Sequence, residues 1–373
     1  MYNFIMSKII VGMSGGVDSA VTAYLLKKQG HEVIGVFMRN WDSIANNDLL
    51  GNPNATKDAV ICPEEEDWND VIKLGEQIGI PVERVDFIKE YWDMVFKDLI
   101  EQYEKGRTPN PDILCNKYVK FGSFHEWVYS KYPDADFIAT GHYAGVKDGI
   151  LHKPFDEWKD QTYFLAQVSR EKLRKTLFPL STLPKAEVRK IAEENNLIVA
   201  NKKDSTGICF IGERDFTKFL QNYIPNQPGK VVDITNNKII GDHIGAMYYT
   251  IGQRKGLNLG GMSEPYYVAG NDLKQKIIYA APASDKSYLI SDSAEVIDVN
   301  WLDDQNNKKN LDVKFRYKTK SIKCTIEWMN KNTIKVLYPE GFEAVTPGQQ
   351  AVFYDGNICL GGGIINKVFS KEK

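Results

Sequence analysis

Residues 8–19 have the sequence KIIVGMSGGVDS, an apolar run followed at once by a glycine-rich polar loop and a helix-forming segment. Two adjacent glycines, Gly15 and Gly16, let the backbone turn tightly and approach a ligand without side-chain obstruction. The helix that follows presents unpaired backbone N–H groups at its first turn. A strand, a loop and a helix in this order predict an anion site, and serine hydroxyls with backbone amides suit the pyrophosphate portion of ATP.

The loop lacks the Gly-Lys-Ser or Gly-Lys-Thr sequence of a Walker loop, so it is not built to hold a γ-phosphate during ordinary nucleotide hydrolysis. The alternative interpretation is a strand-to-helix turn in which serine and Asp18 only cap the helix. Because strand, loop and helix fall in the required order, the phosphate site is favoured.

Strand and helix patterns alternate through the first half of the chain. Gly30 stands where a glycine that ends a helix is expected. Alternation of this kind predicts a parallel sheet covered by helices. Strands are predicted over 9–13, 31–38, 82–87 and 136–140, and helices over 20–29, 68–78, 90–104, 117–132 and 185–196.

Beyond about residue 225 the pattern changes to short β-rich runs broken by turn-forming pairs such as Asn-Asn and Asp-Gly. We therefore expect a parallel-sheet domain over 1–212, a small central domain over 213–283 and a β-barrel over 284–373. The polar, acidic stretch 42–67 has little periodicity and is interpreted as a mobile flap or an insertion.

The composition is that of an ordinary globular protein, since 43% of the 373 residues are hydrophobic and 26% are charged. No apolar stretch reaches the ~18 residues of a membrane-spanning helix and no signal peptide is visible, so we expect a cytoplasmic protein without a membrane partner. The net charge of −2 does not suggest that bulk charge binds nucleic acid, but it leaves a local basic surface open.

The five cysteines are too scattered for a disulfide framework, and none forms a Cys-x-x-Cys pair, so structural zinc is not expected. Cys115 follows two prolines in TPNPDILC, residues 108–115, and lies just before the next predicted helix. That position and nearby Lys117 should favour thiolate over thiol. Asp112, three residues earlier, could carry a proton if the loop folds back.

Cys209 lies in the glycine-containing turn DSTGICFIG, residues 204–212. Sequence spacing does not show whether its thiol is near Cys115, and loop placement leaves both cysteines open between a reactive and a buried structural role. Buried, inert packing is the preferred interpretation for the other three cysteines, which are Cys62, Cys324 and Cys359.

The loop SGGVDS resembles the signature of the ATP pyrophosphatases, enzymes that adenylate a substrate and release pyrophosphate. Further segments extend a more specific likeness over nearly the whole chain. In this order, the segments that resemble the tRNA-specific 2-thiouridylases are GMSGGVDS, RTPNPDILCNKYVKF, TGHYA, KDQTYFL, DSTGICFIGER, YTIGQRKGL and AVTPGQQAVFYDG.

The resemblance implies an α/β fold with an N-terminal, Rossmann-like ATP pyrophosphatase domain, a small α+β middle domain and a C-terminal β-barrel that binds tRNA. It implies that Cys115 is the nucleophile, Cys209 the persulfide carrier and Asp112 the acid/base. The ATP contacts that it implies are Gly12, Met13, Ser14, Gly15, Gly16, Val17, Asp18, Ser19, Met38 and Gly141. The implied tRNA contacts are Asn110, Pro111, Asp112, His142, Lys159, Asp160, Gln161, Arg316, Tyr317 and Gln349.

The activity implied is ATP-dependent 2-thiolation of the wobble uridine of tRNA. A carbonyl oxygen is a poor leaving group, so adenylation must precede its replacement by sulfur. The persulfide on Cys209 then supplies sulfur, and attack by Cys115 on the persulfide bond leaves a transient disulfide. The partners expected are the anticodon loop of tRNA and a sulfur-donor protein, such as a cysteine desulfurase or a sulfur relay protein. The cofactors expected are ATP and Mg²⁺ near Asp18 or the phosphates, although no sequence cluster specifies a metal site.

Basic residues Lys314, Arg316, Lys318 and Lys320 alternate along the chain, so a strand would place their charges on one face. Together with Lys308 and Lys309, they suggest a surface for an anionic ligand. The alternative is the solvated face of a half-buried barrel strand. The tRNA resemblance favours the binding surface.

Two further positions keep alternatives open. The basic turn Gly252–Gly256 is either a phosphate contact or an ordinary hairpin turn. His142 follows a strand end, where open parallel sheets bind ligands, but packing in a core or turn explains it as well. Gly145 replaces an arginine that is usual in the resembled family, which removes one possible RNA or phosphate contact.

Two other functions compete with tRNA thiolation. One is a different adenylating enzyme of the pyrophosphatase type, for example an amidotransferase-coupled synthetase, which would not need two cysteines. The other is an RNA-binding module that keeps the ATP fold without turnover, against which the intact phosphate loop and both cysteines weigh.

Overall fold

A computed structural model describes residues 6–43, 45–46, 63–204, 207–209, 211–212, 214–303 and 310–370. Most of the predicted flap at 42–67, together with Cys62, Lys308 and Lys309, lies outside these residues. Within the described part of the chain, no helix is long and apolar enough to cross a membrane. The chain forms two compact units, one of Met1–Phe96, Pro111–Asp215 and Gly356–Leu360, the other of Lys97–Asn110, Phe216–Asp355 and Gly361–Lys373.

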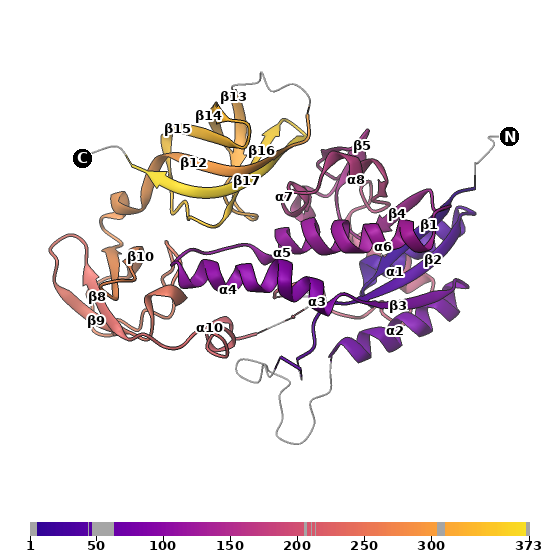
Figure 1. Cartoon of the computed structure of the whole chain (residues 1–373), viewed down its shortest axis with the longest axis horizontal. Coiled ribbons are helices and arrows are strands. Elements are labelled where there is room, and N and C mark those ends of the chain that lie inside the picture. Colours follow the sequence, from indigo (N-terminus) through magenta and orange to yellow (C-terminus); the bar gives the residue numbers. More distant parts are fainter. Residues whose placement is uncertain are drawn as a thin grey trace. The chain divides into compact units, whose positions relative to one another are not determined.

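The first unit is built on a five-stranded sheet with the order β3-β2-β1-β4-β7 (Figure 1). All neighbouring strands run parallel. Ile9, Ile10 and Val11 of the central strand are fully buried, as in a sheet with both faces covered. The predicted parallel sheet is confirmed. Its strands are β1 (Lys8–Met13), β2 (Glu32–Arg39), β3 (Val82–Asp86), β4 (Phe137–Thr140) and β7 (Thr176–Leu177).

The longer helices of this unit overlap the predicted ones, but α2 begins five residues earlier and α6 seven residues later than predicted. They are α1 (Val17–Lys28), α2 (Pro63–Ile78), α6 (Phe124–Lys131) and α9 (Lys185–Glu194). Buried side chains of α1, α2 and α9 share one core with β1. Gly30 has φ +87°, and its N–H donates to the carbonyl of Lys27 at 3.0 Å, which confirms that a glycine ends α1.

Shorter elements fill the rest of the first unit. They are α3 (Ile88–Tyr91), α5 (Pro111–Leu114), the hairpin of β5 (Gly145–Lys147) and β6 (Ile150–His152), the 3-10 turn η3 (Glu157–Lys159), α7 (Thr162–Leu165) and α8 (Arg170–Arg174).

Two of the predicted helices contain π-helical turns, η1 (Trp92–Phe96) and η2 (Cys115–Ser123). In a π-helix each backbone N–H bonds a carbonyl five residues earlier, which widens the turn. Such turns are rare and occur frequently at functional sites. The second of them begins at one of the two cysteines singled out by sequence.

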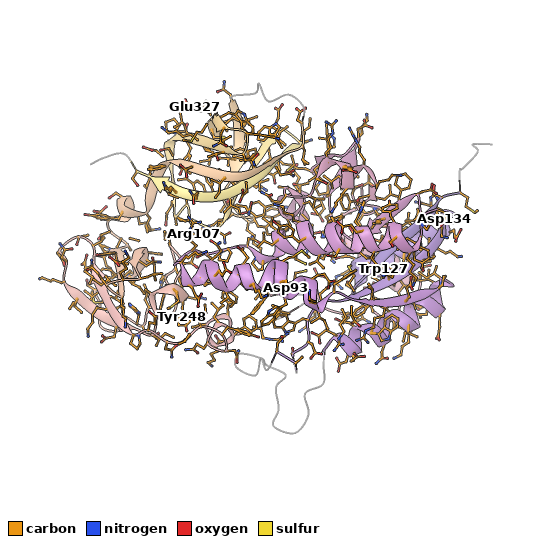
Figure 2. The ribbon with its side chains drawn as sticks, viewed as in Figure 1. Asp93, Arg107, Trp127, Asp134, Tyr248 and Glu327 are labelled. Atoms are coloured by element: carbon orange, nitrogen blue, oxygen red, sulfur yellow. The ribbon has the colours of Figure 1, made fainter. Side chains whose placement is uncertain are left out.

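In the second unit, a four-stranded sheet with the order β10-β11-β8-β9 packs around Val231, Val268 and Ile278. Tyr248, which is labelled in Figure 2, belongs to this region. Its hydroxyl donates to the carbonyl of Ile224 at 2.6 Å. The elements are α4 (Lys97–Glu104), α10 (Phe216–Leu220), β8 (Gly229–Asp233), β9 (Ile239–His243), η4 (Ala246–Tyr248), β10 (Tyr266–Asp272), β11 (Ile277–Pro282) and η5 (Lys286–Leu289).

The C-terminal strands form the predicted barrel, with the order β12-β15-β14-β13-β16-β17 and closure between β12 and β17. Alternate side chains of β13 and β15 point into its core, as a half-buried sheet requires. The strands are β12 (Ile290–Trp301), β13 (Asn310–Lys314), β14 (Ile322–Asn330), β15 (Thr333–Glu343), β16 (Gln350–Asp355) and β17 (Ile358–Phe369).

The predicted basic strand over Lys314–Lys320 is wrong. The strand β13 ends at Lys314, and the chain then turns, with the N–H of Thr319 donating to the carbonyl of Arg316 at 3.2 Å. Phe315 is only 1% exposed and packs against Phe342. Because the strand ends before this turn, the basic residues do not share one strand face.

Candidate active site

The phosphate loop connects the end of β1 to the first turn of α1. Gly15 has φ +70°, and a Cβ there would lie 2.8 Å from the carbonyl oxygen of Asp67, so this position requires glycine. The hydroxyl of Ser19 accepts the N–H of Ser14 at 3.1 Å and donates to the carbonyl of Gly16 at 3.1 Å. These bonds hold the loop in its turn.

The first turn of α1 follows the phosphate loop directly. Gly16 is its N-cap and no side chain caps it among the described residues, so the alternative in which serine or Asp18 only caps the helix is not what the structure has. Gly141 approaches closely, since a Cβ on it would lie 2.8 Å from the Ser19 nitrogen. Gly12 and Met38 meet beside the loop, where a Cβ on Gly12 would lie 3.2 Å from the Met38 methyl.

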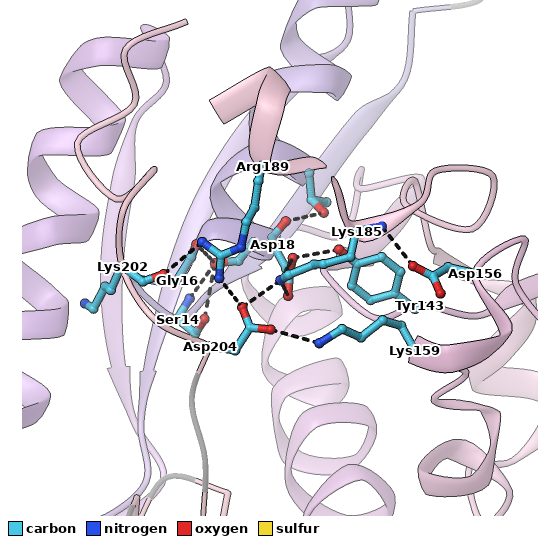
Figure 3. Close-up of polar contacts among 12 residues, drawn as sticks. Ser14, Gly16, Asp18, Tyr143, Asp156, Lys159, Lys185, Arg189, Lys202 and Asp204 are labelled. Atoms are coloured by element: carbon cyan, nitrogen blue, oxygen red, sulfur yellow. Dashed lines mark hydrogen bonds and ion pairs between the residues drawn. The ribbon is translucent and has the colours of Figure 1, made fainter. Parts of the chain in front are cut away.

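Asp18 is part of a network of charged side chains beside the loop (Figure 3). Its carboxylate binds Lys185 Nζ at 2.6 and 2.8 Å and accepts the hydroxyl of Tyr143 at 2.9 Å. Lys185 begins α9, and its ammonium also lies 2.9 Å from Asp204 Oδ1. The helix α9 thus delivers a cation to the edge of the phosphate loop.

Asp204 also forms ion pairs with Arg189 at 2.6 Å and with Lys159 at 2.9 Å (Figure 3). Burial opposes ionisation, but hydrogen bonds from Lys159 and Lys185 lower the pKa of Asp204 to about 2. Lys185 and Arg189 lie four residues apart and so share one face of α9. Among the residues described, no group of three or more His, Cys, Asp or Glu side chains is placed to hold a metal ion.

The two cysteines that sequence singled out are neighbours. Cys115 Sγ lies 3.7 Å from Cys209 Sγ although 94 residues separate them, and both are free thiols. Asp112 Oδ1 accepts the backbone N–H of Cys209 at 2.9 Å, and the hydroxyl of Tyr91 donates to the Cys209 carbonyl at 2.9 Å. The two sulfurs are therefore close enough for a disulfide to form with little movement.

The electrostatics of the pair differ from the sequence prediction. Burial and a hydrogen bond to Cys209 raise the pKa of Cys115 well above its usual range. The hydrogen bond from Cys115 lowers the pKa of Cys209, burial opposes this, and the charge of Lys120 adds to it. Cys209 is therefore the thiol that ionises first. Lys117, predicted to act on Cys115, instead donates to Gln167 Oε1 at 3.2 Å.

The surroundings of Asp112 shift its pKa, and its role as a proton carrier stays a prediction. Burial raises the pKa of Asp112, while the N–H of Cys209 and the charge of Lys120 oppose the rise. An aspartate with a raised pKa exchanges protons closer to neutral pH than an exposed one. Cys324 and Cys359 are buried, as predicted, and burial raises the pKa of Cys324 to about 12.

His142 is held within the first unit. Its Nδ1 shares a hydrogen bond of 2.8 Å with the Thr140 hydroxyl, and its ring lies near Phe121 and Phe178. Burial and the charge of Lys120 lower the pKa of His142 well below its usual range, so the ring is neutral. The turn-packing alternative describes these contacts, and the tRNA role of His142 stays a prediction.

Side-chain hydrogen bonds to neighbouring residues hold the segment 159–161. Asp160 is 3% exposed and accepts both the N–H and the hydroxyl of Thr162, at 3.0 and 2.6 Å, while Gln161 accepts the N–H of Tyr143 at 2.8 Å. Immediately before it, Trp158 is 96% exposed. The prediction missed this tryptophan, whose one signal was its place beside a segment implied to contact tRNA.

Two predicted tRNA contacts of the second unit bind backbone carbonyls. Arg316 Nη2 donates to Ala344 at 2.6 Å and to Ile251 at 3.2 Å. Gln349 Nε2 donates to the carbonyl of Thr108 at 2.9 Å. Gln349 thus holds the backbone two residues before Asn110.

Three further positions that the sequence analysis named are Tyr317, Pro111 and Gly145. Tyr317 lies in the turn after β13 and is partly exposed. Pro111 starts α5, whose second residue is Asp112. A Cβ on Gly145 would lie 3.2 Å from the Cβ of His152, so a larger residue there would press on the hairpin of β5 and β6.

Three known families match successive parts of the chain. Residues 7–213 match the family described as tRNA methyl transferase HUP domain, 217–282 match tRNA methyl transferase PRC-barrel domain, and 291–365 match Aminomethyltransferase beta-barrel domain.

Full-length relatives also match. A tRNA-specific 2-thiouridylase MnmA from Mycoplasmopsis pulmonis is 59% identical, covering 98% of each chain. A protein of the same name from Mycoplasma mobile is 60% identical, again covering 98% of each. Among solved structures, an NMN synthetase from Francisella tularensis covers 54% of this chain and 68% of its own at 16% identity and a TM-score of 0.34, too distant to support an inference.

Proposed function

Because the chain belongs to the family of tRNA-specific 2-thiouridylases, we propose that it replaces the 2-carbonyl oxygen of the wobble uridine of tRNA with sulfur at the expense of ATP. The observation that carries the proposal is the 3.7 Å separation of the Cys115 and Cys209 sulfurs beside Asp112. A different adenylating enzyme would have no use for this pair.

The phosphate loop binds the pyrophosphate portion of ATP. The first turn of α1 offers N–H groups to the phosphates, and the positive end of the helix dipole favours their charge. Lys185 lies at the same edge and supplies a charge for the departing pyrophosphate. Mg²⁺ arrives with ATP, since this ion usually keeps water and phosphate ligands. The uridine oxygen attacks the α-phosphate and pyrophosphate leaves.

Sulfur delivery uses both thiols. The terminal sulfur of a Cys209 persulfide attacks the activated ring carbon, and AMP leaves with the former carbonyl oxygen. Cys115, deprotonated by Asp112, then attacks Cys209 Sγ. The bond between Cys209 Sγ and the transferred sulfur breaks, its electron pair stays with the sulfur on the ring, and a Cys115–Cys209 disulfide forms. A thiol reductant restores both cysteines for the next turnover.

The wobble base must leave its stack to reach the thiols, which an unpaired anticodon nucleotide can do. We assign the segment Lys159–Gln161 and the exposed Trp158 to this RNA, because a solvent-exposed aromatic ring beside a lysine suits stacking on an unpaired base. We also propose that the second unit contacts RNA through Arg316, Tyr317 and Gln349. A persulfide-carrying protein is the proposed sulfur donor.

The test is mass spectrometry of nucleosides from unmodified tRNA incubated with the protein, ATP and a persulfide donor. The proposal predicts 2-thiouridine that depends on ATP and disappears with either Cys115→Ser or Cys209→Ser. The control is Cys324→Ser, which changes a buried thiol of the barrel. Thiolation that survives both site variants would overturn the mechanism. Pyrophosphate release without any thiolation would favour another adenylating enzyme.

A further inference from the structure

Lys120 lies on the π-helical segment η2, five residues after Cys115. In an α-helix of about 3.6 residues per turn, a residue five positions on points well away from the first. In a π-helix the hydrogen bond joins residues five apart, so position 120 follows position 115 by about one turn. The wide turn therefore aligns Lys120 with the thiol of Cys115.

The charged and titratable groups around Lys120 come from several elements. It forms a side-chain hydrogen bond with Cys209, and its charge acts on Cys115 of η2, on Asp112 of α5 and on His142 after β4. Lys120 is only partly exposed, so solvent screens its charge weakly. It is a cation placed among the groups that handle sulfur.

The neighbouring lysine of the same segment does not share this position. Lys117 donates to Gln167 Oε1 at 3.2 Å, and its ammonium lies 5.0 Å from the ring centre of Tyr118. Two lysines on one turn thus have separate surroundings. They form a matched pair in which the charge of Lys120 acts on both sulfurs, whereas the ammonium of Lys117 binds Gln167.

We propose that Lys120 is the counter-ion of sulfur transfer, whose ammonium binds the anionic sulfur on Cys209 and aims it at the activated uridine. This role rests on the proposed function and deepens it. Cys209 must be an anion twice, as the thiolate that accepts sulfur and as the persulfide that donates it. At each stage Lys120 supplies the opposite charge and keeps its own proton.

The ionisation of the site supports this role. Burial alone would lower the pKa of Lys120, but the charges of Cys209 and Cys115 raise it above its ordinary value. Lys120 therefore remains an ammonium at neutral pH. Tyr91 contacts the Cys209 carbonyl, but burial and the charges of Cys115, Cys209 and Asp112 raise its pKa well above the usual range, so it stays neutral. His142 is neutral as well, so it does not replace the charge of Lys120.

The test titrates Cys209 in the full-length protein, in a Cys115→Ser background that leaves one thiol in the site. Peptide mass spectrometry follows alkylation of Cys209 by iodoacetamide across pH. Lys120→Met should raise the midpoint by about one pH unit or more, which means about tenfold less thiolate at a pH below both midpoints. Lys120→Arg should restore the parent midpoint, and Lys117→Met should not move it.

An unchanged midpoint in Lys120→Met would overturn the role of Lys120, provided that the variant melts as a folded protein. Lys120→Gln is the second neutral variant should Lys120→Met fail to fold. The titration needs neither ATP nor tRNA, so its failure is distinct from failure of the proposed function. The latter would appear as absence of 2-thiouridine with the parent protein, whatever the alkylation midpoints are.

Discussion

Asp112 Oδ1 accepts a hydrogen bond of 2.9 Å from the backbone N–H of Cys209. Asp112 lies three residues before Cys115, so this bond links the two segments that carry the thiols. We propose two tasks for this carboxylate: it positions Cys209 through the bond, and it serves as a base for the proton of Cys115. These tasks are separable because an amide oxygen accepts the same N–H but does not take the proton.

Asp112→Asn is expected to keep the fold and the position of Cys209 while slowing thiolation. The rate of one turnover with preformed persulfide should fall by about 100-fold or more, the usual contribution of a general base. Asp112→Ala, which also removes the hydrogen bond, should be slower still. Rates are read from 2-thiouridine formed against time. An Asn variant as fast as the parent would remove the base from the mechanism.

Asp112 should also determine how the thiolation rate falls at low pH. Burial raises the pKa of Asp112, so the carboxylate is present above this raised pKa and is lost as pH falls through it. The parent rate should thus decline at a higher pH than an exposed aspartate would give. In Asp112→Asn this fall should be absent. If the rate falls at the same pH in the parent and in Asp112→Asn, a group other than Asp112 causes the fall.

Lys185→Met should weaken ATP use, since the charged contact at the phosphate loop is lost. The KM for ATP should rise by about tenfold or more, the size of one charged hydrogen bond. Lys190→Met is the matched control, because Lys190 lies on the same helix with its side chain 59% exposed. Equal KM values for the parent and Lys185→Met in a pyrophosphate-release assay would contradict the assignment.

Gly15→Ala should abolish nucleotide binding through backbone strain. Gly15 has φ +70°, and the added methyl group would lie 2.8 Å from the carbonyl of Asp67. Gly30→Ala is the control, since that glycine has φ +87° but nothing within 4 Å of the added carbon. It shares the cost of a left-handed backbone, about 1–2 kcal/mol, without the clash. Calorimetric titration with ATP measures the difference, and normal affinity in Gly15→Ala would contradict the loop assignment.

Trp158→Ala should weaken tRNA binding without changing the chemistry. Loss of one stacked base corresponds to about 1–3 kcal/mol, or roughly a five- to 150-fold rise in Kd for an anticodon stem-loop. Ile198→Ala is the control, because Ile198 is another exposed apolar side chain of the same unit. Alkylation of Cys209 should be the same in both. Equal Kd values for the parent and the tryptophan variant would remove Trp158 from the RNA surface.

Local features of the site were predictable, because they depend on a few adjacent residues. The phosphate loop follows from an apolar strand, two glycines and a helix start, and Gly30 ends α1 as its sequence position indicates. The parallel sheet followed from the alternation of strand and helix patterns.

Other features depend on contacts between distant segments, which spacing does not encode. The meeting of Cys115 and Cys209 is one example. The raised pKa of Cys115, where the sequence predicted a thiolate, is another, because it follows from burial that only the fold reveals. The π-helical turn that brings Lys120 into play has no sequence pattern of its own. After Lys314, a turn replaces the strand that an alternating charge pattern had indicated, and its hydrogen bond joins Thr319 to Arg316.

The most direct measurement is the stoichiometry of one turnover by persulfide-loaded protein with ATP and unmodified tRNA, in the absence of reductant. Samples are quenched in acid, nucleosides are quantified, and peptides are mapped for the Cys115–Cys209 disulfide. The account predicts one disulfide for each 2-thiouridine, formed at the same rate and only with ATP. Formation of 2-thiouridine while both thiols remain free would contradict it.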